Sequence, residues 1–391
     1  MKQIIIAGGG AAGFFAAIHA KAAAPDASVV ILEKSRELLA KVAISGGGRC
    51  NVTHHCFDPK ELITRYPRGG KELLGPFHRF QPADTIEWFE SRGIKLKVEE
   101  DGRMFPVSDD SADIVRTLTR EARESGVEIR LGQGLSNAEY LNPGFRVGLT
   151  DGSEMECQVL ILATGGNRAS GGWAVAEQLG HSIVEPIPSL FSFHVRDAVI
   201  EGLAGISVDP VAVRIPEMHA EQSGPMLITH KGLSGPAILK LSAWQARELS
   251  ERQDEVGLEI NWVAGVSPDE VKRDLERNRG QRGARPVLKT VMYDLPRRLW
   301  ERLCGRAGIV NDVQWARLTA DQELGLWTAL TAMPCRMRGK TLNKEEFVTC
   351  GGVELKEVDM KTFRSRICHG LFFAGEVLNV DGVTGGFNFQ A

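Results

Sequence analysis

Residues 4–13 have the sequence IIIAGGGAAG, and the architecture of the chain follows from this stretch. Ile4–Ala7 is a short apolar run that suits a buried parallel strand, and the alanine-rich text from Phe14 to Ala24 favours a helix. Gly8, Gly10 and Gly13 fit the pattern G-x-G-x-x-G, which serves a tight turn, a close approach to pyrophosphate, and close helix–strand packing. The pattern alone is weak evidence for a dinucleotide site, but here it also follows a predicted strand and opens a predicted helix. The sequence therefore predicts a dinucleotide-binding α/β fold.

An acidic residue stands where such a fold needs one. A second strand is predicted over residues 28–32, and Glu33 ends it. A carboxylate at this place accepts hydrogen bonds from ribose hydroxyls and disfavours the 2′-phosphate of NADP. Two further apolar strands run into glycine turns, VLILATGG at 159–166 and GLFFAGEVLNVDG at 370–382. A plain NAD dehydrogenase needs neither strand, whereas FAD proteins of the glutathione-reductase-like class use both, so we expect FAD.

A third glycine-rich stretch, KVAISGGGRCNVT, spans residues 41–53. Three glycines allow the backbone to lie against a flat ligand, beside the polar side chains of Arg49 and Asn51. With these motifs the chain resembles the bacterial flavoproteins grouped with aminoacetone oxidase and the 3-dehydro-bile-acid reductases, distant relatives of the fumarate-reductase-like FAD enzymes. The resemblance covers essentially the whole chain, on the motifs GGGAAG (8–13), LEK (32–34), SGGGRCNVT (45–53), DGRMFPVS (101–108), ATGG (163–166), THKGLSGP (229–236) and AGEVLNVDGVTGGFNFQ (374–390).

The resemblance implies an FAD site made of separate segments. The first glycine loop would hold the pyrophosphate, Glu33 and Lys34 the adenosine ribose, and the third glycine stretch would lie along the flavin ring. The strand ends at 163–165 and 375–376 and the last loop would close the remaining sides. The cofactor residues implied in this way are Gly8, Gly10, Ala12, Gly13, Glu33, Lys34, Lys41, Gly46, Gly48, Arg49, Cys50, Asn51, Ala163, Thr164, Gly165, Gly375, Glu376, Gly385, Gly386, Phe387, Asn388 and Phe389.

The composition changes along the chain predict an insertion. Helices alternate with strands up to about residue 188, and strands without intervening helices are expected from there to about 265. Ser267-Pro268-Asp269-Glu270 is a strong helix start. We therefore expect a Rossmann-like FAD-binding domain, glutathione-reductase-like, in residues 1–188. It is interrupted by an inserted β-barrel (189–265) and a helical subdomain (266–332), and residues 333–391 return through the insert to the FAD-binding domain.

The sequence motifs give less information about which residues are catalytic. His230 lies in a turn-rich segment of the insert and is a candidate proton donor, with a structural histidine as the alternative. Arg103 is a candidate for binding a substrate carboxylate or carbonyl, with a surface salt bridge as the alternative. Cys50 beside Arg49 either has a lowered pKa or packs against the cofactor, and packing is favoured. His54 and His55 have no spaced third ligand, so we expect no metal.

Charge and composition limit the partners. The 391 residues carry a net charge of -3, which points neither to nucleic acid nor to an anionic membrane. Acidic residues are interleaved in the basic segment 272–306, which favours a solvated helix face over an RNA site. No apolar run is long enough to span a membrane, and the seven scattered cysteines fit a reducing compartment. We expect a cytoplasmic protein, and the sequence does not predict its oligomeric state.

The function expected from these features is that of an FAD-dependent oxidoreductase. It would transfer hydride equivalents between flavin and a small organic substrate, with NAD(P)H or oxygen as the other redox partner. The alternative is a flavin-binding module without turnover that acts in RNA or protein binding. Family members continue past the last loop into a helix facing the flavin, whereas this sequence ends at Gln390-Ala391, so weaker flavin retention is expected if that helix is absent.

Overall fold

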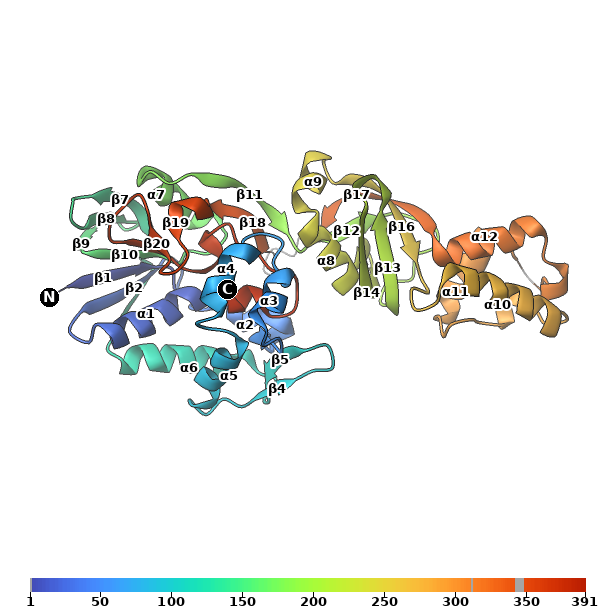
Figure 1. Cartoon of the computed structure of the whole chain (residues 1–391), viewed down its shortest axis with the longest axis horizontal. Coiled ribbons are helices and arrows are strands. Elements are labelled where there is room, and N and C mark those ends of the chain that lie inside the picture. The colour runs from blue at the N-terminus through green and yellow to red at the C-terminus, as the bar shows by residue number, and fades with distance from the viewer. Residues whose placement is uncertain (1, 311, 342–347) are drawn as a thin grey trace. The chain divides into compact units, whose positions relative to one another are not determined.

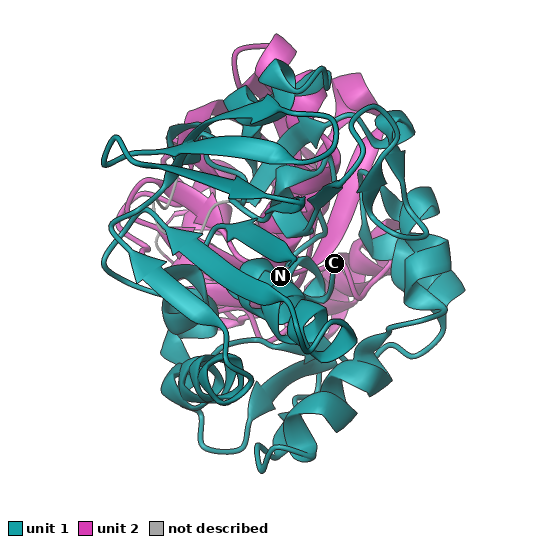
Figure 2. Ribbon diagram, turned by 90° about the vertical axis from the view of Figure 1, so that its left-hand side faces the viewer, with its two compact units in different colours: residues 1–189, 344–391 teal, residues 190–343 magenta. Residues whose placement is uncertain are grey.

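The computed structural model describes residues 2–310, 312–341 and 348–391. The chain forms two compact units (Figure 2), unit 1 with residues 1–189 and 344–391 and unit 2 with residues 190–343. Unit 1 thus contains both ends of the chain, and unit 2 is inserted between them in the sequence. This confirms the predicted fold class, a dinucleotide-binding domain carrying an insertion. The predicted return through 333–391 includes residues 342–347, which lie outside the described residues.

Within the described residues, unit 1 is built on a seven-stranded sheet with the order β19-β20-β21-β10-β1-β2-β6. The strands from β21 to β6 run parallel, and β1 pairs Ala7 with both Leu162 and Leu32, so neighbouring strands end in one row. Ile5 and Ile6 are fully buried, as expected for a parallel strand covered on both faces. The bounds are β1 Gln3–Ala7, β2 Ser28–Glu33, β6 Glu128–Leu131, β10 Val159–Leu162, β19 Val358–Asp359, β20 Arg364–Ser365 and β21 Leu371–Phe373.

Helix α1 (Ala11–Ala23) packs against β1, β2 and helix α6 (Ser111–Glu124), and Figure 1 shows the two helices on the same side of the sheet. The buried residues Ile114, Leu118 and Ala122 recur every fourth position and give α6 one apolar face. The other helical segments of unit 1 are α2 Ala40–Gly48, α3 Pro59–Leu62, η1 Ile63–Arg65, α4 Gly70–Phe77, α5 Pro82–Glu90, η2 Arg168–Ser170, α7 Gly172–Gln178, η6 Leu355–Glu357, η7 Gly375–Val377 and α13 Phe387–Gln390.

Smaller antiparallel sheets flank the main sheet in unit 1. One has the order β3-β5-β4, another β7-β8-β9, and a third pairs β11 with β18. The first carries Arg103 and the residues that follow the third glycine stretch. The bounds are β3 Thr53–His54, β4 Leu96–Val98, β5 Arg103–Pro106, β7 Leu135–Tyr140, β8 Phe145–Leu149, β9 Glu154–Cys157, β11 Ile183–Ser189 and β18 Val348–Val353.

Unit 2 contains a closed barrel with the order β12-β15-β14-β13-β16-β17. Its strands alternate between buried and exposed residues, for example Val211, Val213 and Ile215, which are all fully buried. The predicted β-barrel is therefore confirmed. The bounds are β12 Ser192–Val195, β13 Ser207–Ile215, β14 Ala220–Thr229, β15 Gly232–Ser234, β16 Glu255–Asn261 and β17 Met333–Thr341.

The expectation of strands without helices before residue 265 was wrong. Helices α8 (Pro236–Trp244) and α9 (Ala246–Glu251) lie between β15 and β16. Gly235 has a φ of 93° directly before Pro236, which starts α8 at its first turn. Ile238 and Leu241 are fully buried on one side of α8, so a short run of apolar residues that suits a strand is here the inner face of a helix.

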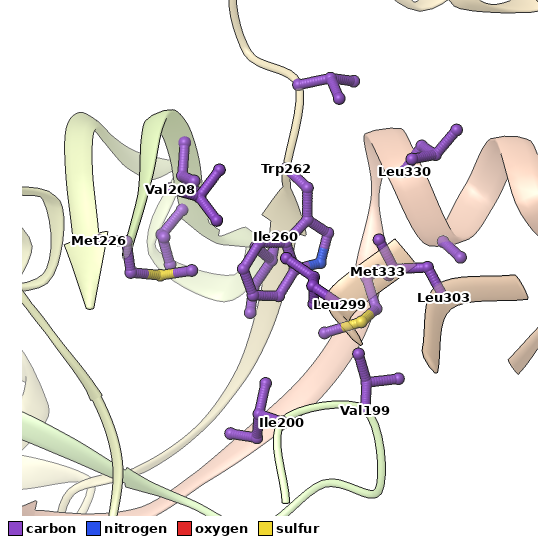
Figure 3. Close-up of a cluster of buried hydrophobic side chains, with 14 of the residues drawn as sticks. Val199, Ile200, Val208, Met226, Ile260, Trp262, Leu299, Leu303, Leu330 and Met333 are labelled. Carbon is purple, nitrogen blue, oxygen red and sulfur yellow. The ribbon is translucent and has the colours of Figure 1, made fainter. Parts of the chain in front are cut away.

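Three longer helices lie between the barrel strands β16 and β17 in the sequence and share the core of the barrel. Figure 3 shows Trp262 and Ile260 next to Leu299, Leu303 and Met333, and these residues belong to one buried cluster. The Ser267 hydroxyl accepts a hydrogen bond from the Glu270 amide at 3.3 Å, as predicted for the start of α10. Barrel and helices are therefore one compact body. The bounds are η3 Pro216–Met218, α10 Pro268–Gln281, η4 Val287–Lys289, α11 Arg297–Arg306, η5 Trp315–Arg317 and α12 Ala320–Thr331.

Candidate functional site

The carboxyl ends of β2, β1, β10 and β21 form one edge of the unit 1 sheet. In the pairings among these four strands the last residues are Leu32, Ala7, Leu162 and Phe373, and each is followed by residues that the sequence assigns to the cofactor. Ligands of open α/β sheets bind outside this edge. The register thus gathers four sequence-predicted segments that lie far apart in the chain.

The three glycines of the first loop differ in what surrounds them. A Cβ on Gly8, which has a φ of 114°, would lie 2.3 Å from the Ala163 carbonyl oxygen. A Cβ on Gly13 would lie 1.9 Å from the Gly8 carbonyl oxygen. By contrast, a Cβ on Gly10 would meet no heavy atom of the described residues within 4 Å. Gly8 and Gly13 are needed for packing, whereas Gly10 leaves its backbone open to a ligand.

The N-terminus of α1 is available to an anion. Gly10 is its N-cap and makes no side-chain capping bond, and none of the described residues in the first turn is acidic. The first backbone N–H groups of a helix have no partner within the helix, and its dipole favours negative charge there. This end of α1, beside the open face of Gly10, fits a pyrophosphate group.

Glu33 is the last residue of β2, and Lys34 follows it next to the loop. The Glu33 carboxylate accepts hydrogen bonds from the Gly9 amide at 2.7 Å and the Ser35 amide at 2.8 Å. Each carboxylate oxygen has a second lone pair, so the group can still accept a bond from a ribose hydroxyl. The Lys34 ammonium donates to the Ala169 carbonyl at 2.8 Å, which ties the end of β2 to the turn after β10.

The turns after β10 and β21 meet beside the first loop. A Cβ on Gly375, which has a φ of 73°, would lie 2.8 Å from the Cβ of Ala12 in α1. The Glu376 carboxylate accepts from the Thr349 amide at 2.9 Å and pairs with Lys41 at 2.8 Å. On the β10 side, a Cβ on Gly165 would lie 3.8 Å from Glu376 Oε2.

The contacts of Gly375 and Glu376 therefore place Lys41, Gly165 and the start of α1 in one cluster. Thr164, between Ala163 and Gly165, lies against Gly172, where an added Cβ would be 1.9 Å from Thr164 Oγ1. Thr349 gave no signal in the sequence, because a backbone amide donor belongs to no motif.

The third glycine stretch exposes bare backbone. Gly46, Gly47 and Gly48 have φ values of 58°, 70° and 84°, and they end the short helix α2 in a left-handed turn. A Cβ on Gly47 or Gly48 would meet no described heavy atom within 4 Å, while one on Gly46 would lie 2.8 Å from the Phe105 ring. Such a surface fits a flat aromatic ligand, and together with the Gly10 opening it fits FAD.

Cys50 follows this turn and is 2% exposed. Burial raises the pKa of its thiol to about 11, although a hydrogen bond with Ser45 acts in the opposite direction. The alternative of a lowered pKa beside Arg49 was therefore wrong. Packing of Cys50 against the cofactor stays a prediction.

Arg49 and Arg103 bind the same acidic group. Arg49 Nη1 lies 2.6 Å from Glu99 Oε1, and its guanidinium stacks over Phe105 at 3.9 Å. Arg103 pairs with Glu99 at 2.9 Å and with Asp101 at 2.7 Å. The side chain of Arg49 therefore fixes the β3-β5-β4 sheet beneath the glycine turn. The salt-bridge alternative for Arg103 is the arrangement that the structure has.

The last loop is held by side chains from distant segments. The Asn51 amide donates to the carbonyls of Thr53 and Met104 at 3.1 and 3.2 Å and accepts from the Gly386 N–H at 2.9 Å. The Asn388 side chain bonds both backbone groups of Gly382 at 2.8 Å.

Aromatic contacts continue this anchoring of the last loop. The Tyr66 hydroxyl donates to the Phe387 carbonyl at 2.7 Å, and His54 Nδ1 lies 3.0 Å from the Gly385 carbonyl oxygen. Phe389 packs against the hydrophobic core that includes α1. The polar side chains predicted to face the flavin thus hold the backbone around it.

A buried ion pair completes this anchoring, and no motif indicated it. Asp381 is fully buried and accepts from Arg68 Nε at 2.5 Å, from a second Arg68 nitrogen, and from the Ser189 hydroxyl at 2.9 Å. It joins the segment before α4 to the last loop and to the end of β11.

His230 belongs to unit 2. It is exposed in the turn between β14 and β15, where the Thr229 hydroxyl accepts from the Lys231 amide at 3.3 Å. Its role as a proton donor stays a prediction. In the part of the chain that the structure describes, no group of three His, Cys, Asp or Glu side chains is arranged to hold a metal. A search of the same residues finds no helix with the length and hydropathy to cross a membrane.

The chain is similar to known proteins over its whole length. A family model described as the HI0933-like protein Rossmann domain matches residues 2–391. The ribosomal RNA dihydrouridine synthase of Escherichia coli is 31% identical and aligns over 99% of this chain and 94% of its own. The 3-dehydro-bile acid delta(4,6)-reductase of Clostridium scindens is 28% identical over 100% and 96%. The 3-ketosteroid-delta4-(5alpha)-dehydrogenase structure from Rhodococcus jostii RHA1 is similar in fold, with a TM-score of 0.51, 13% identity, and coverage of 100% and 95%.

Proposed function

Because the chain belongs to the HI0933-like family and is an FAD-dependent oxidoreductase, we propose that it reduces a carbon–carbon double bond conjugated to a carbonyl group. The proposed substrate is the uracil base of a uridine in ribosomal RNA. The observation that carries this choice is the similarity to the Escherichia coli ribosomal RNA dihydrouridine synthase, at 31% identity over 99% of the chain. The expectation from the sequence was a small organic substrate without nucleic acid.

The names of the two aligned relatives describe related chemistry. Dihydrouridine is uridine with its C5–C6 bond saturated, and that bond is conjugated to the C4 carbonyl. A delta(4,6)-reductase of a 3-dehydro bile acid saturates double bonds conjugated to a ketone. In both reactions a hydride adds to a carbon made electrophilic by conjugation with the carbonyl, at the β position or its vinylogous δ position, and a proton adds to the chain of carbons between that position and the carbonyl. One flavin site therefore suits either substrate.

Bound FAD would supply the hydride at its N5 position. The residues of the chain would bind and orient it: the N-terminus of α1 and Gly10 at the pyrophosphate, Glu33 at the ribose, and the backbone of Gly46–Gly48 along the ring. Glu376 would lie along the ribityl chain, and Lys41, which pairs with it, would lie toward the flavin ring. His230 is the proposed proton donor to the α carbon.

We propose NADH or NADPH as the reductant. The sequence contains a single G-x-G-x-x-G loop, which FAD would occupy, so the nicotinamide would have to reach the flavin directly. A cytoplasmic location would give access to both nicotinamide and ribosomal RNA. The first half of the reaction is tested by adding NADH or NADPH to the protein in the absence of oxygen. Reduction of the flavin is measured as the loss of its absorbance.

The second half is tested by adding an unmodified ribosomal RNA transcript to the anaerobically reduced protein. We expect reoxidation of the flavin and dihydrouridine in the digested RNA, measured by mass spectrometry. A transcript with 5,6-dihydrouridine in place of uridine is the matched control and must leave the flavin reduced. Absence of dihydrouridine at stoichiometric enzyme would refute the choice of substrate.

A small enone is the second candidate substrate. The similarity to the bile acid reductase, 28% over 100% of the chain, favours it. Steroid 4-en-3-ones and their saturated counterparts, added to the same reduced protein, distinguish the two candidates. Reoxidation by the enone alone would select a small-molecule reductase. RNA binding without reoxidation by either substrate would favour the flavin-binding module without turnover.

A further inference from the structure

One segment of unit 2 carries a concentrated positive charge that the flavin site does not use. Residues 277–289, RNRGQRGARPVLK, contain five basic residues and no acidic one, in a chain whose net charge is -3. The segment covers the end of α10 and the loop into η4. In Figure 1 it lies at the end of unit 2 opposite the barrel.

The fold brings a further arginine to this segment. The Ala316 amide donates to the Gly283 carbonyl at 3.0 Å, and the Trp315 amide to the Arg285 carbonyl at 3.1 Å. Arg317 is the next residue, so these two hydrogen bonds bring it close to Arg282 and Arg285. We call Arg279, Arg282, Arg285 and Arg317 the tip patch, and all four are exposed.

Three of the four arginines of the tip patch have no acidic partner among the described residues, whereas Lys289, at the end of the segment, lies 3.7 Å from Asp312. Arg279 pairs with Glu323 at 2.7 Å, and Arg277, outside the patch, pairs with Asp274 at 2.7 Å. Across the described ranges, no acidic side chain lies within ion-pair distance of Arg282, Arg285 or Arg317. A cation at the end of α10 is favoured by the helix dipole, which accounts for Arg282. Arg285 and Arg317 lie beyond that effect.

We propose that the tip patch binds the phosphate backbone of RNA, an inference that rests on the proposed function for the identity of its partner. Guanidinium groups match phosphate with paired hydrogen bonds and are weakly hydrated, so exposed arginines without acidic partners suit a polyanion. Contacts with phosphate give affinity and position but no sequence preference. The patch therefore adds affinity for the RNA, while the flavin site selects the base.

The test compares two triple variants with equal charge changes. R282Q/R285Q/R317Q removes the three arginines without acidic partners, and R116Q/R120Q/R123Q removes three exposed arginines of α6 in unit 1. The dissociation constant of each holoprotein for an unmodified ribosomal RNA transcript is measured at several KCl concentrations. Flavin content and melting temperature are recorded for both variants, so that a folding defect is recognised.

The patch variant is expected to bind RNA roughly 10- to 100-fold more weakly at about 0.1 M KCl. Its log–log salt slope should be shallower by about 2, since each phosphate contact contributes about 0.7–0.9. The α6 variant should bind like the unaltered protein. Equal affinities of the two variants would overturn the inference, as would binding to phosphatidylglycerol vesicles without binding to RNA. RNA binding that depends on the patch, without dihydrouridine formation, would support the patch and refute the proposed function.

Discussion

Replacement of Gly10 by valine separates binding of the nucleotide from stability of the fold. Gly10 has φ and ψ of -88° and -175°, an extended conformation that any residue adopts, and its added Cβ would meet no described heavy atom within 4 Å. The protein itself therefore loses little in G10V. Replacement of a glycine N-cap by valine costs about 0.5–1 kcal/mol, and the stiffer unfolded chain offsets about 0.4–1 kcal/mol.

The cost to the cofactor is larger. The valine side chain would occupy the space that a pyrophosphate needs to reach the backbone N–H groups at the start of α1. Charge-assisted hydrogen bonds contribute about 1.5–3 kcal/mol each, so loss of one or two of them amounts to about 3 kcal/mol. This corresponds to a roughly 100-fold weaker affinity for FAD.

The assay is the FAD-to-protein ratio after purification and the dissociation constant of added FAD, beside the melting temperature of the apoprotein. Two controls frame it. Gly305 in α11 also has open surroundings, so G305V should retain FAD. G13A places a Cβ 1.9 Å from the Gly8 carbonyl oxygen and should destabilise the apoprotein by about 1–3 kcal/mol. Retention of FAD by G10V at the ratio of the unaltered protein would refute the nucleotide site.

Three further predictions concern stability and reactivity. D381A should destabilise unit 1 by about 3 kcal/mol in denaturant titration, because it removes the buried carboxylate that Arg68 and Ser189 bind. D359A, which removes a half-exposed carboxylate, should destabilise it much less. Burial lowers the pKa of His181, whose side chain is fully buried, so the folded state disfavours its protonation. The stability that neutral His181 contributes is fully present above its ordinary pKa of about 6.5 and is lost as the pH falls below that value. The melting temperature of H181Q should therefore decrease less from pH 7 to pH 5 than that of the unaltered protein. Cys50, with a pKa of about 11, should react with iodoacetamide roughly 100-fold more slowly at about pH 8 than an ordinary thiol, measured by peptide mass spectrometry.

Each of these has an outcome that contradicts it. Equal losses of stability in D381A and D359A would show that the buried ion pair makes no special contribution. An unchanged acid dependence in H181Q would assign the pH effect to other groups. Labelling of Cys50 in the folded holoprotein at the rate of the unfolded chain would show that the thiol is accessible.

The parts of the fold that were predictable are those encoded in neighbouring residues. The turn after β1, the acid at the end of β2 and the glycine turns after β10 and β21 each follow a short apolar run, and strand and turn preferences depend on only a few neighbouring residues. Contacts between distant segments were not predictable. Asp381 lies 313 residues from Arg68 and 192 residues from Ser189, and a single Arg or Asp in a sequence does not indicate its partner.

The same limit explains why residue types at the candidate site were easier to assign than their roles. Arg49 and Asn51 were expected to face the flavin, because charge and amide groups beside glycines suit a polar ligand, and the family resemblance implied a cofactor contact for Asn388. In the structure they bind Glu99, Gly386 and Gly382, and the surface left open is the backbone of Gly10, Gly47 and Gly48. A glycine-rich turn has few side chains of its own, so polar neighbours must hold its conformation if the backbone is to serve as the binding surface. Some polar side chains touch the ligand, and others hold the backbone that touches it. Sequence alone does not distinguish these two roles, since both select the same residue types at the same positions.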